Sequence, residues 1–325
     1  MKVAIDVTPL AQTRAGTARY LQALLPRLEP AVELAQLRGF ARGPAGTLWL
    51  DLAWYPHVLP LRARGADVLH CPTYRAPLRS RVPTVVTVHD VAVFRIPEAF
   101  PVWTRRYSRA VLPGVLRAAR RILAVSEFTA SELVQLFGVP RDKIRVVPNA
   151  VDPVFTADGP RADGDYALAV GTLEPRKNLA RTIEAARQLG IEVRVVGARG
   201  WGGVAADGAG VRWLGEVTDN ELARLYRGAL CVVYPSLYEG FGIPVLEALA
   251  CGTPVVTAAG GGTEEVAGGA AVLVDPHDAR AIAAGIEEAL ARRDQLRPLG
   301  RARAHAFSWD ESARLTLEAY AEAAA

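Results

Sequence analysis

The fold is decided by residues 231–249, which read CVVYPSLYEGFGIPVLEAL. The first four, Cys231–Tyr234, form an apolar run typical of a buried β-strand, and a loop with two glycines follows. A helix is predicted from about Pro244, because proline is favoured at the first helical positions, where an N–H group would lack a partner anyway. A strand, a loop and a helix in direct succession are the repeating unit of parallel α/β sheets.

The same alternation continues outward in both directions. Short β-branched runs separated by segments with helical spacing predict buried parallel strands, so we expect an α/β fold with two doubly wound, Rossmann-like sheets. The runs lie at residues 3–7, 68–70, 84–89, 121–125 and 144–147, and again at 166–170, 193–196, 211–214, 231–234, 254–257 and 271–274.

A polar segment at residues 152–165 is rich in turn-forming residues and has the composition of a linker. We therefore predict a first domain over residues 1–155 and a second over residues 156–306. Residues 307–325 have an amphipathic helical pattern, and we expect this segment to return to the first domain.

Charge is distributed unevenly between these halves. Residues 1–155 hold 21 basic and 11 acidic side chains, whereas residues 156–325 hold 17 and 23, which indicates domains with different partners. Residues 103–121 interleave arginines with apolar side chains, a pattern that fits contact with an anionic membrane or a phosphorylated acceptor, or else a solvated helix face. No nucleic-acid-binding module is recognisable, so nucleic acid is not expected as a partner.

Composition also disfavours several protein classes. No apolar run approaches the roughly 20 residues of a membrane-spanning helix, and the run at residues 3–7 is too short for a secretory signal core. The three cysteines lack the spacing of zinc ligands or of a disulfide framework. We expect a cytoplasmic protein without a metal or a cofactor.

The loop at residues 235–243 has the features of an anion site. The first turn of the following helix suits a phosphate, and Gly240 and Gly242 would let a bulky ligand approach the backbone. Glu239 and Glu247 could face one crevice, where carboxylates bind sugar hydroxyls. The alternative is that Glu239 is a surface loop residue and Glu247 an exposed helix charge.

A second segment, residues 170–179, reads VGTLEPRKNL and also joins an apolar strand to an amphipathic helix. Its Arg176 and Lys177 precede the helix at the end where their charge opposes the helix dipole. Such a pair is unfavourable as structure alone, and it is explained if an anion such as a diphosphate lies between the two cations. Asn178 fits a simple N-cap.

Together these two segments resemble the retaining glycosyltransferases of family four, which have the GT-B architecture. Residues 171–178 are similar to that family's diphosphate-binding segment, and Glu239 and Glu247 match its Glu-x7-Glu motif. Further matches follow in the family's order at residues 14–20, 87–90, 126–127, 147–152, 251–256 and 275–278. The resemblance implies two Rossmann-like domains that face each other across a cleft, the first binding the acceptor and the second the nucleotide sugar.

The resemblance also implies roles for single residues. As catalytic residues, Lys177 would neutralise the departing diphosphate, Glu239 would hold the transferred sugar, and His89 would contact that sugar near the reacting carbon. The residues implied in substrate binding are Gly16, Thr172, Arg176, Gly240, Phe241, Gly242 and Glu247. Of these, Glu247 would bind the donor ribose and Gly16 would let the backbone approach the phosphates. Many relatives have arginine at the position of Thr172, so either Arg176 supplies the missing charge or phosphate binding rests on Lys177 alone.

Two of these regions also have other interpretations. A lone histidine after an apolar strand is often a hydrogen-bonded core residue, but the carboxyl end of a parallel strand is where open α/β sheets bind ligands, so a site role is favoured for His89. The glycine-rich loop at residues 258–266 lacks the spacing of an ATP- or NAD-binding loop and is expected to border the nucleotide at most.

We expect transfer of a hexose, with retained anomeric configuration, from a nucleotide sugar to a hydroxyl acceptor, lipid-linked or polysaccharide. Residues 171–178 resemble many mannosyltransferases, so GDP-mannose is the first expected donor and UDP-glucose the second. No Asp-x-Asp motif stands where a metal-dependent transferase needs one, so the reaction is expected to be metal-independent. The alternatives are a GT-B-like nucleotide-sugar epimerase or phosphorylase, and a non-catalytic sugar-nucleotide binder. The basic first domain suggests peripheral contact with the inner membrane face.

Overall fold

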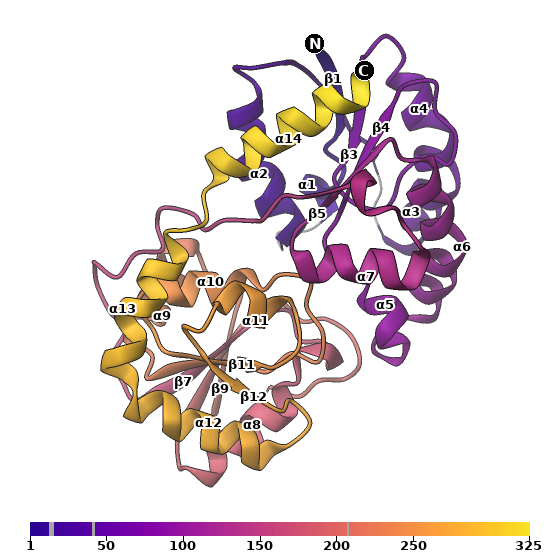
Figure 1. The fold of residues 1–325 in the computed structure, drawn as a ribbon. Coiled ribbons are helices and arrows are strands. Elements are labelled where there is room, and N and C mark those ends of the chain that lie inside the picture. The colour runs from indigo at the N-terminus through magenta and orange to yellow at the C-terminus, as the bar shows by residue number, and fades with distance from the viewer. Residues whose placement is uncertain (13–15, 41–42, 207) are drawn as a thin grey trace. The chain divides into compact units, whose positions relative to one another are not determined.

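The computed structural model describes residues 1–12, 16–40, 43–206 and 208–325. Within them the chain forms two compact units, each built on a parallel six-stranded sheet (Figure 1). Unit 1 comprises Met1–Phe94, Phe100–Asn149 and Trp309–Ala325, and unit 2 comprises Arg95–Ala99 and Ala150–Ser308. The predicted α/β class is confirmed, whereas the domain bounds 1–155, 156–306 and 307–325 stay a prediction.

The sheet of unit 2 contains the stretch that decides the fold. Its strands are β7 (Tyr166–Val170), β8 (Glu192–Val196), β9 (Val211–Gly215), β10 (Cys231–Tyr234), β11 (Val255–Ala258) and β12 (Val272–Val274). All neighbours pair in parallel, in the order β12-β11-β10-β7-β8-β9. Each strand coincides with a predicted apolar run to within two residues, because short apolar runs are typical of strands buried on both faces.

Helices cover this sheet and close its core. They are α8 (Leu179–Gln188), α9 (Asp219–Gly228), α10 (Ile243–Ala250), α11 (Gly262–Ala267), α12 (Ala279–Ala291) and α13 (Arg293–Ala304), with a 3₁₀ turn η4 (Pro175–Lys177) before α8. Ile282 and Ile286 of α12 pack with Val233 and Val256 of the sheet in one buried apolar cluster. Removing such side chains from water is the main stabilising contribution to a core of this kind.

The sheet of unit 1 has the order β2-β1-β3-β4-β5-β6, again with parallel neighbours. Its strands are β1 (Lys2–Asp6), β2 (Glu33–Leu37), β3 (Val68–Cys71), β4 (Thr84–Val88), β5 (Arg121–Ala124) and β6 (Ile144–Val146). The sequence did not predict β2. This edge strand reads ELAQL and has no buried residue, so it lacks the apolar run by which the other strands were found.

The helices of unit 1 include one unusual segment, the π-helix η1 (Leu50–Val58). The other helices and turns are α1 (Pro9–Gln12), α2 (Gly16–Leu28), α3 (Gly43–Trp49), α4 (Leu59–Arg62), α6 (Val102–Ala118), α7 (Glu127–Phe137), η3 (Arg141–Lys143) and α14 (Trp309–Ala324). Between β4 and α6 the chain forms α5 (Ala92–Arg95) and η2 (Pro97–Ala99). Helix α7 begins where the Ser126 hydroxyl accepts a hydrogen bond from the Thr129 N–H at 2.9 Å, and it ends at Gly138 in the left-handed conformation.

Helix α14 packs on unit 1, as the yellow helix beside α2 in Figure 1 shows. The Tyr320 hydroxyl lies 2.7 Å from Nδ1 of His70, and Nε2 of His70 lies 2.8 Å from the Thr87 hydroxyl. This buried histidine therefore joins α14 to β3 and β4. Burial lowers the pKa of His70 to about 3, and the nearby His89 acts in the same direction.

We expect His70 to make the folded protein sensitive to acid. The imidazole is neutral in the native state, whereas the unfolded chain takes up a proton below its ordinary pKa of about 6.5. Stability should therefore fall as the pH decreases from about 6.5 towards 3, by about 1.4 kcal/mol per pH unit from this residue. Urea denaturation at pH 7 and pH 5 measures the effect, and His70→Gln should show the smaller difference between the two. Equal pH dependence in both proteins would contradict this assignment.

Candidate active site

The site residues predicted in the second domain lie after β7 and β10, the two adjacent strands where the strand order of unit 2 reverses. From β7 the chain continues through β8 to β9, and it then returns to the other side of β7 as β10. Open α/β sheets bind ligands at the carboxyl ends of the strands beside such a reversal. Lys177 follows β7 and Glu239 follows β10, so the topology brings their loops together.

A buried ionic cluster joins these two loops. Nζ of Lys177 lies 2.7 Å from Oε1 of Glu239, and Nη1 of Arg176 lies 2.8 Å from the same oxygen. Nε of Arg176 lies 2.7 Å from Oε1 of Glu174. The Glu239 and Arg176 side chains are only 10% and 16% exposed. Two carboxylates thus neutralise the two cations that precede α8, which compensates for their unfavourable position relative to the helix dipole.

The cluster fixes the charge of Glu239. Burial alone would raise the pKa of this carboxyl group, but the positive charges of Arg176 and Lys177 outweigh burial and lower the pKa to about 2. Burial and the charge of Arg176 lower the pKa of Lys177, while Glu239 and Glu174 oppose this shift. Glu239 is therefore a carboxylate at neutral pH and acts only as a hydrogen-bond acceptor.

Tyr234, the last residue of β10, completes the cluster and was not predicted from the sequence. Its hydroxyl accepts a hydrogen bond from Nζ of Lys177 at 2.5 Å and donates one to Oε1 of Glu239 at 3.1 Å. Two of the three N–H donors of the Lys177 ammonium are thereby directed to protein oxygens. The sequence signal that could have identified Tyr234 is its hydroxyl group at the end of the apolar strand that directly precedes the Glu239 loop.

Two glycines give this site its shape. Gly171, directly after β7, has φ 143°, and a Cβ atom there would lie 3.2 Å from Cε of Lys177. Gly242 has φ 101° at the start of α10, where a Cβ atom would lie 2.7 Å from Cγ2 of Thr263. Residues that carry a Cβ atom rarely adopt these backbone conformations, so both positions require glycine.

The glycine-rich loop after β11 packs against the loop of Glu239. The N–H group of Gly262 donates to the backbone oxygen of Glu239 at 3.2 Å, and a Cβ atom on Gly262 would lie 2.4 Å from the oxygen of Gly240. Phe241 is buried and contacts the ring of Phe307 edge-on at 5.7 Å. The loops after β7, β10 and β11 thus form one continuous group.

The predicted residue Glu247 lies in α10 and is only 2% exposed. Its Oε2 accepts a hydrogen bond from the Tyr226 hydroxyl at 2.8 Å. The alternative interpretation of Glu247 as an exposed helix charge is therefore wrong. Thr172 is half-buried. Its methyl group lies so close to Gly200 in the neighbouring loop that a Cβ atom added to that glycine would be only 2.7 Å away.

Asn178 occupies the N-cap position of α8 but does not cap the helix with its side chain. It is the one non-glycine residue with positive φ among those the structure describes, at 59°. Its Nδ2 donates to the backbone oxygens of Pro235 and Pro276 at 3.0 and 2.6 Å. Asn178 therefore ties the loop after β7 to the loops after β10 and β12.

In unit 1, His89 follows β4 and is half-buried. Its Nε2 lies 3.0 Å from the backbone oxygen of Pro72, which can only accept a hydrogen bond, so Nε2 carries the hydrogen and Nδ1 of the neutral ring is an acceptor. Burial lowers the pKa of His89 and favours this neutral form. Tyr20 of α2 contacts the ring edge-on at 5.2 Å. Gly16 is the exposed first residue of α2, while Arg14 and Ala15 of the same predicted loop lie outside the described residues.

Other site types find little support in the described part of the chain. No group of three or more histidine, cysteine, aspartate or glutamate side chains there could hold a metal ion. Cys71, Cys231 and Cys251 are all buried as free thiols. None of the described helices is both long and apolar enough to cross a membrane.

Similarity to known proteins supports the family resemblance that the sequence motifs indicated. Residues 5–155 match the family described as Glycosyltransferase Family 4, and residues 155–305 match the family described as Glycosyl transferases group 1. O-antigen chain mannosyltransferase B from Escherichia coli is 36% identical over 282 residues, which cover 78% of this chain and 74% of that protein. D-inositol 3-phosphate glycosyltransferase from Geodermatophilus obscurus is 34% identical, and 76% of this chain covers 62% of its length.

Solved structures support the fold. Sucrose-phosphate synthase from Thermosynechococcus elongatus superimposes with a TM-score of 0.79 over 99% of this chain and 98% of its own, at 22% identity. Anabaena HepE in complex with UDP and glucose superimposes with a TM-score of 0.74 over 98% of both chains, at 18% identity. These likenesses confirm the predicted GT-B type of fold, and the sequence matches show that the chain belongs to glycosyltransferase family 4.

Proposed function

We propose that this glycosyltransferase moves a hexosyl group from a nucleotide sugar to a hydroxyl acceptor with retention of the anomeric configuration. The observation that carries the proposal is the buried contact of Glu239 with Lys177 and Arg176 beside the reversal in the sheet of unit 2. It joins a cation suited to a diphosphate with a carboxylate suited to sugar hydroxyls. The family membership of the chain supports the same reaction class.

Lys177 is proposed to bind the leaving diphosphate. Two of its N–H donors are directed to Tyr234 and Glu239, and the third is available to a phosphate oxygen. Its fixed positive charge, together with the N–H group of Ile243 at the start of α10, would stabilise the departing group without a metal ion. Gly240 and Gly242, and Gly16 at the start of α2, would allow the phosphates to approach the backbone closely.

Glu239 and His89 are each proposed to bind the sugar. The carboxylate of Glu239 would accept hydrogen bonds from sugar hydroxyls, and Nδ1 of His89 would accept one more. Glu247 is proposed to bind the donor ribose, and Thr172 and Phe241 to line the donor site.

Arg176 is proposed to position Glu239 instead of binding phosphate. Its guanidinium contacts Glu174, Glu239 and the backbone oxygen of Tyr238. These contacts direct it towards the carboxylates of the chain. Because Thr172 occupies the position where many relatives have arginine, phosphate binding would then depend on Lys177 and the backbone.

In the proposed reaction the acceptor attacks from the face that the diphosphate leaves. The bond between the anomeric carbon and the diphosphate oxygen breaks, and a bond to the acceptor oxygen forms. The proton of the acceptor hydroxyl passes to the leaving diphosphate. Glu239 is held by two cations and so is suited to bind the sugar and not to act as a nucleophile.

GDP-mannose is the proposed donor, with UDP-glucose as the second choice, and the proposed acceptor is lipid-linked or a polysaccharide. The similarity to two O-antigen chain mannosyltransferases, from Escherichia coli and Salmonella typhimurium, supports the first donor and this acceptor class. The fold likeness to HepE solved with UDP and glucose is the reason to keep the second donor.

A thermal-shift screen tests the donor. A ligand that binds only the native state stabilises it by about 2.7 kcal/mol at 100 times its Kd, so GDP and GDP-mannose should raise Tm more than UDP and UDP-glucose. NMR of the product formed with an acceptor should show the donor's anomeric configuration. Conversion of the sugar without acceptor, stabilisation without any transfer, or an inverted product would each contradict the proposal.

The two cations should behave differently on substitution. Lys177→Ala removes the proposed diphosphate ligand and should lower kcat on the order of 10²–10³-fold. Arg176→Gln should shift the acidic limb of the kcat/KM profile to higher pH, because Glu239 loses one of the two charges that lower its pKa. Arg176→Lys should restore part of that shift.

Arg187→Ala, an exposed position on α8, is the matched control and should leave both kcat and the pH profile unchanged. A near-normal kcat for Lys177→Ala would remove Lys177 from the mechanism. An unchanged pH profile for Arg176→Gln would show that Arg176 does not act through Glu239.

The start of α6 is proposed to contact an anionic membrane surface. Val102 and Trp103 are 51% and 39% exposed, and arginines follow them on the same helix. Trp103→Ala should reduce cosedimentation with vesicles that contain phosphatidylglycerol. Trp201→Ala in unit 2 removes an indole of similar exposure, 37%, and serves as the control. Equal losses in both variants would argue against this surface.

A further inference from the structure

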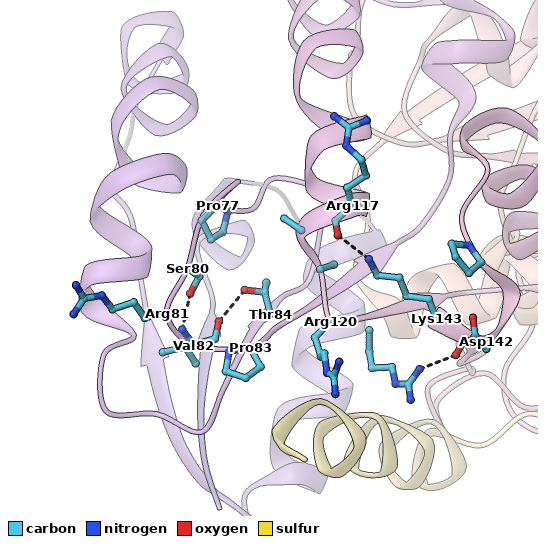
Figure 2. Close-up of a pocket in the computed structure, with 14 residues that line it drawn as sticks. Pro77, Ser80, Arg81, Val82, Pro83, Thr84, Arg117, Arg120, Asp142 and Lys143 are labelled. Atoms are coloured by element: carbon cyan, nitrogen blue, oxygen red, sulfur yellow. Dashed lines mark hydrogen bonds between the residues drawn. The ribbon is translucent and has the colours of Figure 1, made fainter.

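A basic groove lies in unit 1 at the amino ends of β4, β5 and β6. It has a volume of about 660 Å³. It is lined by Pro77 and residues 80–84 up to the start of β4, by residues 117–121 from the end of α6 to the start of β5, and by Pro140, Asp142 and Lys143 before β6 (Figure 2). His89 follows β4 at its carboxyl end, so the groove and His89 lie at opposite ends of this strand. None of the residues proposed for sugar transfer lines it.

One cation of the groove is used by the fold itself. Nζ of Lys143 donates to the backbone oxygens of Leu116 and Arg117, at 2.8 Å in each case. Figure 2 shows the second of these bonds, between Arg117 and Lys143. Lys143 thereby caps the carboxyl end of α6, where the last carbonyl groups of a helix lack partners within the helix. The arginines around it are not needed for this purpose.

Three arginines that line the groove have no carboxylate partner. In the part of the chain that the structure describes, the side chains of Arg81, Arg117 and Arg120 make no ion pair and no hydrogen bond. By contrast, Nε of Arg121 lies 3.1 Å from Oε2 of Glu322, and Arg27 lies 2.6 Å from Asp310. Among the described residues that line the groove, Asp142 is the one acidic residue, so cations outnumber carboxylates there.

The groove is also held in shape before any ligand binds. Its lining includes Pro77, Pro83 and Pro140, whose rings fix the backbone φ angle. The Ser80 hydroxyl accepts a hydrogen bond from the N–H group of Val82 at 3.0 Å (Figure 2). A preorganised site loses less conformational entropy on binding.

We infer that this groove binds a ligand that carries two or more phosphate groups. The planar fork of arginine matches phosphate oxygens in a bidentate way. The volume lies in the range of about 300–1,000 Å³ found for small-molecule sites, which is more than one inorganic phosphate fills. In Figure 2, Arg81, Arg117 and Arg120 lie at separate points around the groove, which suits several phosphates better than one. These come either from a soluble polyphosphorylated molecule or from neighbouring headgroups of an anionic bilayer.

The test compares two double variants that remove the same charge. Arg117→Gln with Arg120→Gln changes the groove, and Arg62→Gln with Arg64→Gln changes exposed arginines of unit 1 elsewhere. Each protein also carries Lys177→Ala, so that the proposed donor site binds the probe more weakly and equally in both. The probes are inorganic tripolyphosphate, titrated by calorimetry, and vesicles with and without phosphatidylglycerol, assayed by cosedimentation. Circular dichroism and Tm confirm that both variants are folded.

The groove variant should raise the Kd for at least one probe by tenfold or more, while the control changes it by less than twofold. Loss for tripolyphosphate with vesicle binding unchanged identifies a soluble ligand, and loss for vesicles alone identifies lipid headgroups. Equal weakening in the two variants would overturn the inference, because it would show only the general basicity of unit 1. Failure of the parent protein to bind either probe would overturn it as well.

Discussion

The buried contact between Glu239 and the two cations Arg176 and Lys177 is the interaction on which unit 2 depends. Each of these groups would be unfavourable alone, because an unpaired charge loses its hydration on burial. Together they hold the loop after β7 against the loop after β10, with Tyr234 between them. Since these strands are the neighbours at which the sheet order reverses, the same contact closes the fold and builds the candidate site.

The sequence predicted the sheets well wherever the strands are apolar. All six strands of unit 2 and five of the six strands of unit 1 coincide with the predicted runs. Strand β2 was missed because an edge strand buries little, so ELAQL carries no apolar run. The π-helix η1 has no local signal either, since its Pro56 would normally argue against a continuous helical segment there. Both segments contact residues distant in the sequence: β2 pairs with β1, and Asp51 of η1 contacts Arg75 and Trp103.

The candidate site was predicted in part. The sequence motifs predicted Lys177, Arg176 and Glu239 as site residues. In the structure, Glu239 contacts both Arg176 and Lys177. The structure also shows that carboxylates of the chain itself pair with the unfavourable cations before α8. The sequence had suggested an external anion in this position. Tyr234 was missed because a local pattern does not show which partners the fold brings from another strand. Glu174 lies only two residues before Arg176, so it was a local partner that the sequence prediction overlooked. The role of each site residue in sugar transfer stays a prediction.

The return of α14 to unit 1 has a consequence for biosynthesis. Tyr320 and Trp309 cover His70 and Tyr20, yet a ribosome produces them only after the whole of unit 2. Unit 2 is continuous apart from a short segment made earlier, so all its strands and helices have emerged when α14 appears. The half of the protein that is translated first is therefore the last to bury its apolar surface, and until then that surface is exposed to aggregation.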